Sequence, residues 1–315
     1  MWPTDRTGPA LRAHLAERLT LPLFAAPMFL VSGPELIVAA ARAGALSAFP
    51  SINARTGAAL AAWLERIAEG ARGGAPWGVN LIVHRSNTRL QDDLAATDRA
   101  RAPLVEASVG TPDDVVAAVH AYGGLVFSDV ASVRHARKAA AAGVDGLVLL
   151  TAGAGGNTGW LNPFAFVAEV RRFFDGPLAV AGAVGTGRAL HALEVLDADL
   201  GYAGTPFIAT GESRAATDHK ASVVTTAADG VTQSSLVTGI PANFARESLV
   251  REGVIAPDGT PLHEGALDIA SWKTVWSMGH GCGGVSAVRP AAEVIAGMAA
   301  DWRAARQMAR SRPAQ

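Results

Sequence analysis

The chain is built on one repeating pattern: a short apolar run, a loop of small residues and an alanine-rich amphipathic stretch. Short apolar runs predict buried strands, and apolar residues at helical spacing predict the helices between them. The predicted strands are Leu21–Ala25, Ala45–Phe49, Trp77–Ile82, Leu104–Ala107, Leu125–Ser128, Gly146–Leu150, Leu178–Ala181 and Leu200–Ala203. The predicted helices include Gly33–Arg42, Thr56–Glu69, Thr111–Ala121, Val133–Ala142, Pro163–Phe174 and Thr186–Leu196.

Eight strands alternating with helices imply a parallel sheet, and eight such units fit a closed α/β barrel, the (β/α)8 TIM barrel. A doubly wound sheet is the alternative, and it concentrates its phosphate-binding glycines after the first strand. Here the glycine-rich junctions follow the sixth, seventh and eighth strands. Their position favours the barrel.

No charged or Pro/Ser-rich linker divides the chain. We expect residues 1–205 to form the main part of the barrel. Residues 206–286 make the eighth unit longer than the others, and we expect them to form a lid or small subdomain over the mouth. Residues 287–315 are predicted to close the barrel with a helix over Glu293–Arg310.

The composition excludes several classes of function. Half of the 315 residues are hydrophobic and 17% are charged, which supports a large core and argues against disorder. A net charge of −1 gives no strong field for nucleic acid or an acidic membrane, so we expect neither as a partner. The single cysteine, Cys282, excludes an internal disulfide. With no apolar signal-peptide core near Met1, we expect a cytoplasmic protein.

The glycine-rich junctions point to a phosphate-bearing ligand. The run Thr151–Gly159 follows the sixth strand directly, Gly182 and Ala183 follow the seventh, and Gly204 and Thr205 follow the eighth. Glycine lets backbone N–H groups approach a ligand closely, and the loops after the last two strands are the usual phosphate site of barrel enzymes. Ordinary tight turns between strand and helix are the alternative.

Other strand ends carry residues that suit a flat ring. Ala26, Pro27 and Met28 end the first strand with small residues and a rigid proline. Asn80 places a polar amide in an apolar strand, where it needs a partner, either a ring edge or a core hydrogen bond. Asp129 follows the fifth strand and either faces the same mouth or caps the next helix.

His280 differs from the other histidines because glycines surround it, in Ser277–Gly284, and it is a candidate for a role in the site. Cys282 is expected to be buried and inert. Phe29, Trp160 and Phe164 predict an apolar mouth that suits a small apolar substrate. No spacing of Cys, His and carboxylates supports a metal site, and neither a Ser-His-Asp set nor a Walker loop is present.

Together these segments resemble the nitronate monooxygenase family, also called 2-nitropropane dioxygenase-like, a group of FMN-dependent barrel enzymes. The resemblance runs from about Leu21 to the closing helix, and the order and spacing of its short pieces are specific. The matching pieces are Ala26–Met28, Trp77–Leu81, Ser132–Ala136 with Gly143–Asp145, Ala154–Gly159, Gly182, Gly204 and Thr205, and Phe207–Thr210.

The resemblance implies FMN as the cofactor and gives each matching residue a role. Residues implied to touch the flavin are Ala26, Pro27, Met28 and Asn80, and Asp129 is counted with the cofactor-binding residues. Gly155 and Gly156 are implied to line the flavin edge, and Gly182, Ala183, Gly204 and Thr205 to hold the phosphate.

One departure from the family bears on mechanism. The family has a histidine after its paired glycines, as catalytic base or to position the substrate, and this chain has Asn157. An amide cannot take a proton from carbon, although it can donate a hydrogen bond to a nitro oxygen. Since a nitronate is already deprotonated, we predict that nitronates are turned over better than neutral nitroalkanes. Some relatives also have a lysine where this chain has Asp129, which changes the electrostatic surroundings of the flavin.

Three interpretations of function stay open. The first is a nitronate monooxygenase that uses FMN and O2 to convert alkyl nitronates into a carbonyl compound and nitrite, with Asn157 and His280 as candidate catalytic residues. The second is an FMN-dependent NAD(P)H reductase of a quinone or an enoyl thioester. The third is a flavin-binding protein of impaired activity. The oligomeric state also stays open, with a homodimer as one option.

Overall fold

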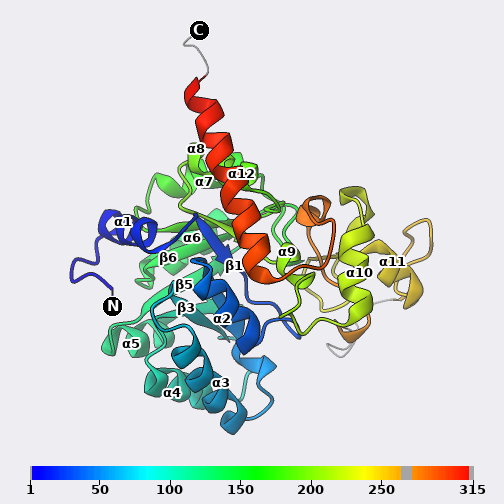
Figure 1. Cartoon of the computed structure of the whole chain (residues 1–315). Helices are drawn as coiled ribbons and strands as arrows, with labels where there is room; N and C mark the ends of the chain where they lie inside the picture. Colours follow the sequence, from blue (N-terminus) through cyan, green and yellow to red (C-terminus); the bar gives the residue numbers. More distant parts are fainter. Residues whose placement is uncertain (1, 264–271, 312–315) are drawn as a thin grey trace.

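A computed structural model describes residues 2–263 and 272–311 of the chain. Eight parallel strands form a closed barrel, in the order β1-β2-β3-β4-β5-β6-β8-β9 (Figure 1). The strands are β1 (Leu23–Ala25), β2 (Leu46–Pro50), β3 (Trp77–Ile82), β4 (Leu104–Ser108), β5 (Leu125–Val130), β6 (Gly146–Leu150), β8 (Leu178–Ala181) and β9 (Leu200–Ala203). The predicted TIM barrel is confirmed, and each predicted strand overlaps an observed one.

Helices cover the outside of the barrel between consecutive strands. They are α2 (Pro34–Arg42), α3 (Gly57–Gly70), α4 (Leu90–Ala100), α5 (Asp113–Ala121), α6 (Val133–Ala141), α7 (Pro163–Arg171) and α8 (Gly187–Val195). In α3, Leu60, Leu64 and Ile67 share one helical face and are buried against the barrel. The predicted closing helix is α12 (Ala291–Ser311), which packs beside α8 and α2.

The interior of the barrel is apolar at its amino end. Alternate residues of each strand point inward, and Phe24, Leu104, Leu125 and Leu200 pack there among other apolar side chains. Leu11 and Leu15 of α1 (Gly8–Arg18), a helix that the sequence analysis missed, join this cluster. Because α1 packs into this end, a ligand site is left to the carboxyl ends of the strands.

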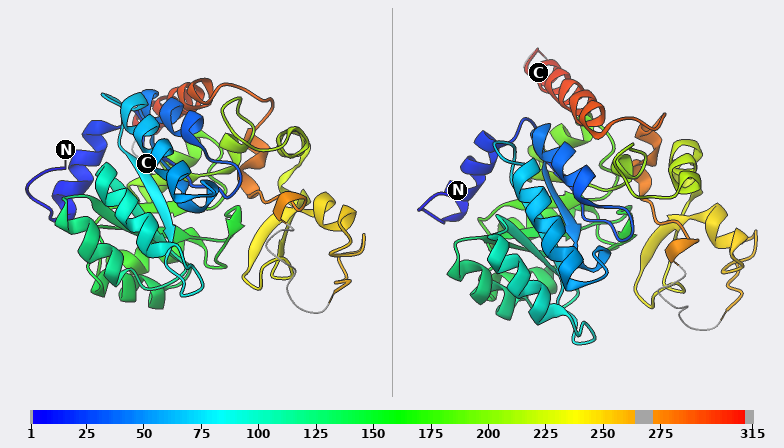
Figure 2. Two further views of the ribbon diagram at one scale, coloured as in Figure 1. Left: turned by 90° about the horizontal axis from the view of Figure 1, so that it is seen from below. Right: turned by 60° about the horizontal axis from the view of Figure 1, so that its bottom comes forward.

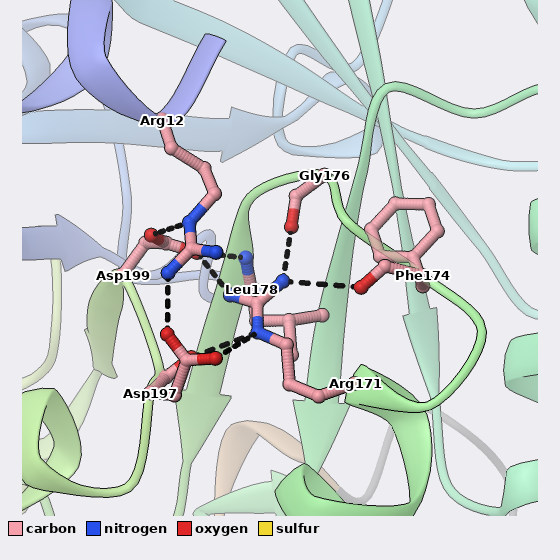
Figure 3. A network of polar contacts seen from close by, with 7 residues as sticks. All are labelled: Arg12, Arg171, Phe174, Gly176, Leu178, Asp197 and Asp199. Atoms are coloured by element: carbon pink, nitrogen blue, oxygen red, sulfur yellow. Dashed lines mark hydrogen bonds and ion pairs between the residues drawn. The ribbon is translucent and has the colours of Figure 1, made fainter. Parts of the chain in front are cut away.

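An ion-pair network fixes α1 to the amino end of the barrel (Figure 3). Arg12 of α1 donates to Asp199 over 2.6 Å and to Asp197 over 2.5 Å. Arg171 of α7 pairs with the same Asp199, and Asp199 also accepts the Leu178 amide at the start of β8. Two helices and the start of β8 are thus bound to one carboxylate, that of the residue before β9, which holds the amino end of the barrel together away from the site.

The described residues within 206–286 form further elements outside the barrel strands, an excursion drawn from yellow-green to orange at one side of the barrel in Figure 2. Its elements are α9 (Thr205–Ile208), α10 (Thr217–Thr225), η2 (Ala228–Gly230), β10 (Val231–Ser234), β11 (Ala242–Ala245), α11 (Arg246–Arg251) and η4 (His280–Gly284). β10, β11 and β7 (Gly156–Asn157) form a small antiparallel sheet. The excursion is therefore paired with the loop after β6. Its role as a lid stays a prediction.

Within the described residues, no helix has both the length and the apolar character needed to span a membrane.

Candidate active site

A cavity of about 720 Å³ opens at the carboxyl ends of the barrel strands. Its wall combines strand ends, the loop after β6 and part of the excursion, including Thr238, Ile240 and Met278. This is the end at which barrel enzymes carry their active sites. A cavity of this size and position is the natural candidate for a binding site in this chain.

The cavity brings together almost all of the residues singled out in the sequence. Its lining includes Ala26, Pro27, Met28, Asn80, Asp129, Gly155, Gly156, Asn157, Gly182, Ala183, Gly204 and Thr205. Segments far apart in the chain therefore converge on one space. The individual roles given to these residues stay predictions.

The side chain of His280 is not among these lining residues. His280 is exposed, and its backbone amide donates to the Gly153 carbonyl over 3.0 Å. Its neighbours Gly279 and Gly281 line the cavity instead. The structure thus gives no support to a catalytic role for the imidazole. Cys282 is buried, as expected, and burial raises the pKa of its thiol.

The predicted apolar mouth holds only in part. Phe29 lines the cavity and packs edge-on against Trp272, with ring centroids 6.0 Å apart. Trp160 and Phe164 are 79% and 66% exposed and are not lining residues, so their part of the prediction is wrong. Trp160 follows β7 in the chain, and Phe164 is in the first turn of α7.

The glycine junctions after β8 and β9 present unpaired backbone donors. Gly182 has φ +132° and Ala183 has φ +56°, a left-handed conformation that is rare for a residue with a side chain. A Cβ on Gly182 would lie 2.2 Å from Thr151 Oγ1. In the part of the chain that the structure describes, the amides of Gly182, Ala183, Gly204 and Thr205 donate to no protein acceptor. Such converging amides suit an anion.

The excursion is held against this rim by buried hydrogen bonds. The Gly279 amide donates to Thr205 Oγ1 over 2.9 Å, so the hydrogen of that hydroxyl can be given to a ligand. Asn243 of β11 donates from Nδ2 to the Ala154 carbonyl over 2.7 Å. The excursion therefore fixes both the glycine loop after β6 and the junction after β9.

Polar side chains form the floor of the cavity, where the barrel interior meets the ligand space. Asn80 donates to Ser108 Oγ over 2.6 Å, so it both lines the cavity and makes the core hydrogen bond foreseen as its alternative. Glu106 of β4 is 1% exposed, and the Tyr202 hydroxyl donates to its Oε1 over 2.7 Å. Its Oε2 has no hydrogen-bond partner among the described residues.

Two carboxyl groups therefore share this floor. The pKa of Glu106 is raised to about 8, mainly by burial and next by the charge of Asp129, against the hydrogen bond from Tyr202. Burial raises the pKa of Asp129 to about 6, although Ser108 and the Val109 amide hydrogen-bond to it and lower it. Since the charge of Asp129 opposes the ionisation of the buried Glu106, Glu106 stays protonated near neutrality. Asp129 does not cap the next helix, whose cap is Ser132.

Comparison with known proteins fits this geometry. The sequence profile of the nitronate monooxygenase family matches residues 88–258, more than half of the chain. The chain belongs to the nitronate monooxygenase family. Membership makes it an oxidoreductase and supports a flavin cofactor.

Curated relatives of this family member differ in activity. A (3aS,4S,5R,7aS)-5-hydroxy-7a-methyl-1-oxo-octahydro-1H-indene-4-carboxyl-CoA dehydrogenase of Rhodococcus jostii is 26% identical over 242 residues, 76% of this chain and 67% of its own. A Mycobacterium tuberculosis protein named as a monooxygenase is 30% identical over 189 residues, 56% of this chain and 50% of its own. Both a dehydrogenase and a monooxygenase thus lie at a similar distance.

Solved structures agree on the fold. A nitroalkane oxidase from Streptomyces ansochromogenes has a TM-score of 0.80 with 23% identity, and covers 94% of this chain and 99% of its own. FabK from Thermotoga maritima has a TM-score of 0.78 with 22% identity, and covers 95% of this chain and 97% of its own. At these identities the likeness concerns the fold alone.

The sequence analysis missed Glu106 and Tyr202 as members of this nitronate monooxygenase family site. The signal for Glu106 was present, because a carboxylate inside the apolar run Leu104–Ala107 needs a partner as much as Asn80 does. Tyr202, in β9, carried no such signal, since a tyrosine is common in strands. Among residues 2–263 and 272–311, no three His, Cys, Asp or Glu side chains group to hold a metal ion.

Proposed function

We propose that this chain is an FMN-dependent nitronate monooxygenase that oxidises alkyl nitronates with O2 to a carbonyl compound and nitrite. Family membership supports the reaction class. The observation that carries the proposal is the row of amides after β8 and β9 that donate to no protein acceptor among the described residues, on the wall of a cavity that small residues such as Ala26 and Gly155 also line. FMN, when bound, supplies the electron-accepting ring for the oxidation.

The residues present fit FMN. Its phosphate needs several donors at one place, and the amides of Gly182, Ala183, Gly204 and Thr205 are available there with the Thr205 hydroxyl. Its flat ring needs a wall without bulky side chains, and Ala26, Pro27 and the Gly155–Gly156 pair supply one. We assign these residues to FMN on that chemistry.

Asn157 is proposed to orient the substrate. It lies in β7 opposite Ala242 of β11 and lines the cavity, so its position is set by the small sheet. Its amide can donate a hydrogen bond to a nitro oxygen but cannot remove a proton from carbon. The expected substrate is therefore the nitronate anion, which needs no base.

An anaerobic absorbance titration of the purified protein tests this function. Ethyl or propyl-2-nitronate should bleach the bound flavin spectrum, and NADH and NADPH should not. A protein with no flavin spectrum, unable to bind added FMN, would contradict both the cofactor and the reaction.

A second candidate is an FMN-dependent NAD(P)H reductase of a quinone or an enoyl thioester. The observation that favours it is the similarity to the Rhodococcus jostii protein, which is a dehydrogenase of a carboxyl-CoA compound and therefore acts on a thioester. Bleaching by NAD(P)H alone in the same titration would select this candidate.

A further inference from the structure

The floor of the cavity holds a buried polar atom that the protein itself leaves without a partner. Glu106 is 1% exposed and lines the cavity, and its Oε2 makes no hydrogen bond within the structure. A buried carboxyl oxygen without a partner costs free energy unless something else meets it. Because Glu106 is among the residues that line the cavity, we expect a bound molecule to supply that partner.

The surroundings of Glu106 determine where its proton lies. Tyr202 donates its hydroxyl hydrogen to Oε1, so Oε1 acts as an acceptor and a proton on the carboxyl belongs on Oε2. Asp129 lines the same cavity and its charge raises the pKa of Glu106. Ionised Asp129 therefore favours a neutral Glu106 beside it.

Nearby cations do not neutralise this floor. Among the ion pairs of the described residues, none involves Glu106 or Asp129. The other charged or titratable residues that line the cavity lie beyond β3: Arg89 is paired with Asp93 over 2.8 Å, and His84 is exposed. β3 itself contributes Asn80 and Ile82 to the cavity lining, and both are neutral.

We propose that Glu106 is a neutral carboxylic acid in the site, which donates a hydrogen bond from Oε2 to an atom of the bound molecule that carries or gains negative charge. Tyr202 and Asp129 are the positioning residues, one fixing the proton on Oε2 and the other keeping it there. A fixed neutral donor in a dry site stabilises such an atom without adding a charge of its own. The inference rests on the proposed function for the identity of the bound molecule, either a nitronate oxygen or an acceptor atom of the flavin ring.

Infrared spectroscopy of the purified protein as a function of pH tests the protonation directly. The carbonyl band of a protonated carboxyl should persist at pH 7 and disappear near pH 8. Glu106→Gln should lack this transition, and Glu65→Gln, an exposed residue of α3, should retain it. Asp129→Asn should move the transition to lower pH, because it removes a charge that raises the pKa. A wild-type spectrum without this transition, or one that survives in Glu106→Gln, overturns the proposal.

Two further arms identify the atom that receives the hydrogen bond. Nitrate, an inert planar oxyanion, should bind roughly 10-fold more weakly at pH 9.5 than at pH 7 if Oε2 faces the substrate, and Glu106→Gln should show less than about 2-fold. If Oε2 faces the flavin, the midpoint potential plotted against pH should change slope near pH 8 in the wild type and not in Glu106→Gln. Tyr202→Phe should reduce the pH dependence near pH 8, whether it is seen in nitrate affinity or in the midpoint potential.

The outcomes separate this inference from the proposed function. The donor role is overturned if neither nitrate binding nor the midpoint potential depends on pH near pH 8. This includes the case in which nitrate fails to bind at any pH and the potential shows no change of slope. A protein that is not reduced by nitronate rejects the proposed substrate, while the infrared and nitrate measurements still decide the role of Glu106.

Discussion

Replacing Glu106 by glutamine should stabilise the folded protein, and the gain should grow as the pH rises. Glu106 has a raised pKa in the folded state, so the folded protein holds a proton that the unfolded chain has lost. The stability that this proton confers is complete below the unfolded pKa of 4.5, and it is lost progressively up to the folded value of about 8. Glutamine does not titrate, so the variant lacks this loss.

The size of the effect follows from the shift. Each pH unit between the two pKa values costs about 1.36 kcal/mol, so the full shift corresponds to roughly 5 kcal/mol as an upper limit. The clearest window lies between pH 6.5 and 8, above the folded pKa of Asp129, which is about 6. Over that window the variant should gain about 2 kcal/mol relative to wild type. The glutamine NH2 group has no protein acceptor at the Oε2 position, which costs a constant amount at every pH.

Equilibrium urea unfolding at several pH values measures this difference. Wild type and Glu106→Gln are compared in the same buffers, with Glu65→Gln as the control for loss of a surface carboxyl. The free-energy difference between variant and wild type should rise with pH, and the control should show none of that rise. Parallel pH dependences for wild type and Glu106→Gln would refute the argument, because they would mean that Glu106 ionises as freely in the folded protein as in the unfolded chain.

Three other predictions follow from the same geometry. Gly182→Ala should weaken FMN binding at least about 10-fold in a fluorescence titration, because its Cβ would meet Thr151, whereas Gly57→Ala, with open space around it, should bind FMN normally. Asn157→His should raise turnover of neutral nitroalkanes about 100-fold relative to nitronates, measured as nitrite release; an unchanged ratio would refute the assignment of Asn157. Burial lowers the pKa of His219 to about 4, so the free energy of unfolding should fall by roughly 3 kcal/mol from pH 6.5 to 4. In acid unfolding curves, His219→Gln should not show this pH dependence, and a variant with the same pH dependence as wild type would contradict the prediction.

The barrel could be predicted because each of its strands is marked by a pattern of residues that are close together in the sequence. Each strand is a short apolar run that ends in small residues, as in Leu178–Ala181, and this pattern survives without knowledge of the neighbours. α4 was missed because Leu90–Ala100 carries four charged residues and few apolar ones. The sheet of β7, β10 and β11 was missed because its pairing joins Asn157 to Ala242, far apart in the chain.

The residues of the site could be predicted where they lie at the ends of predicted strands. Parallel strands bring their carboxyl ends to one rim, so Asn80, Asp129 and Gly204 could be placed together from order alone. His280 is the least supported of the predicted site residues. Flanking glycines indicate that a loop packs closely, while the direction of the side chain depends on how that loop packs. Glu106 is the converse case, since its position inside the barrel follows from the alternation of β4.

The two ends of this cavity differ in their electrostatic character. The rim after β8 and β9 offers amides without counter-charge, which suits an anionic phosphate. The floor carries Asp129 and a second carboxyl, and an anionic substrate approaching it would be repelled if both were ionised. On the proposed function, nitronate binding should therefore weaken as Glu106 ionises near pH 8, although alkaline pH produces more nitronate from a nitroalkane. The pH optimum for nitroalkane turnover should lie where these trends cross, and Glu106→Gln should move it upward.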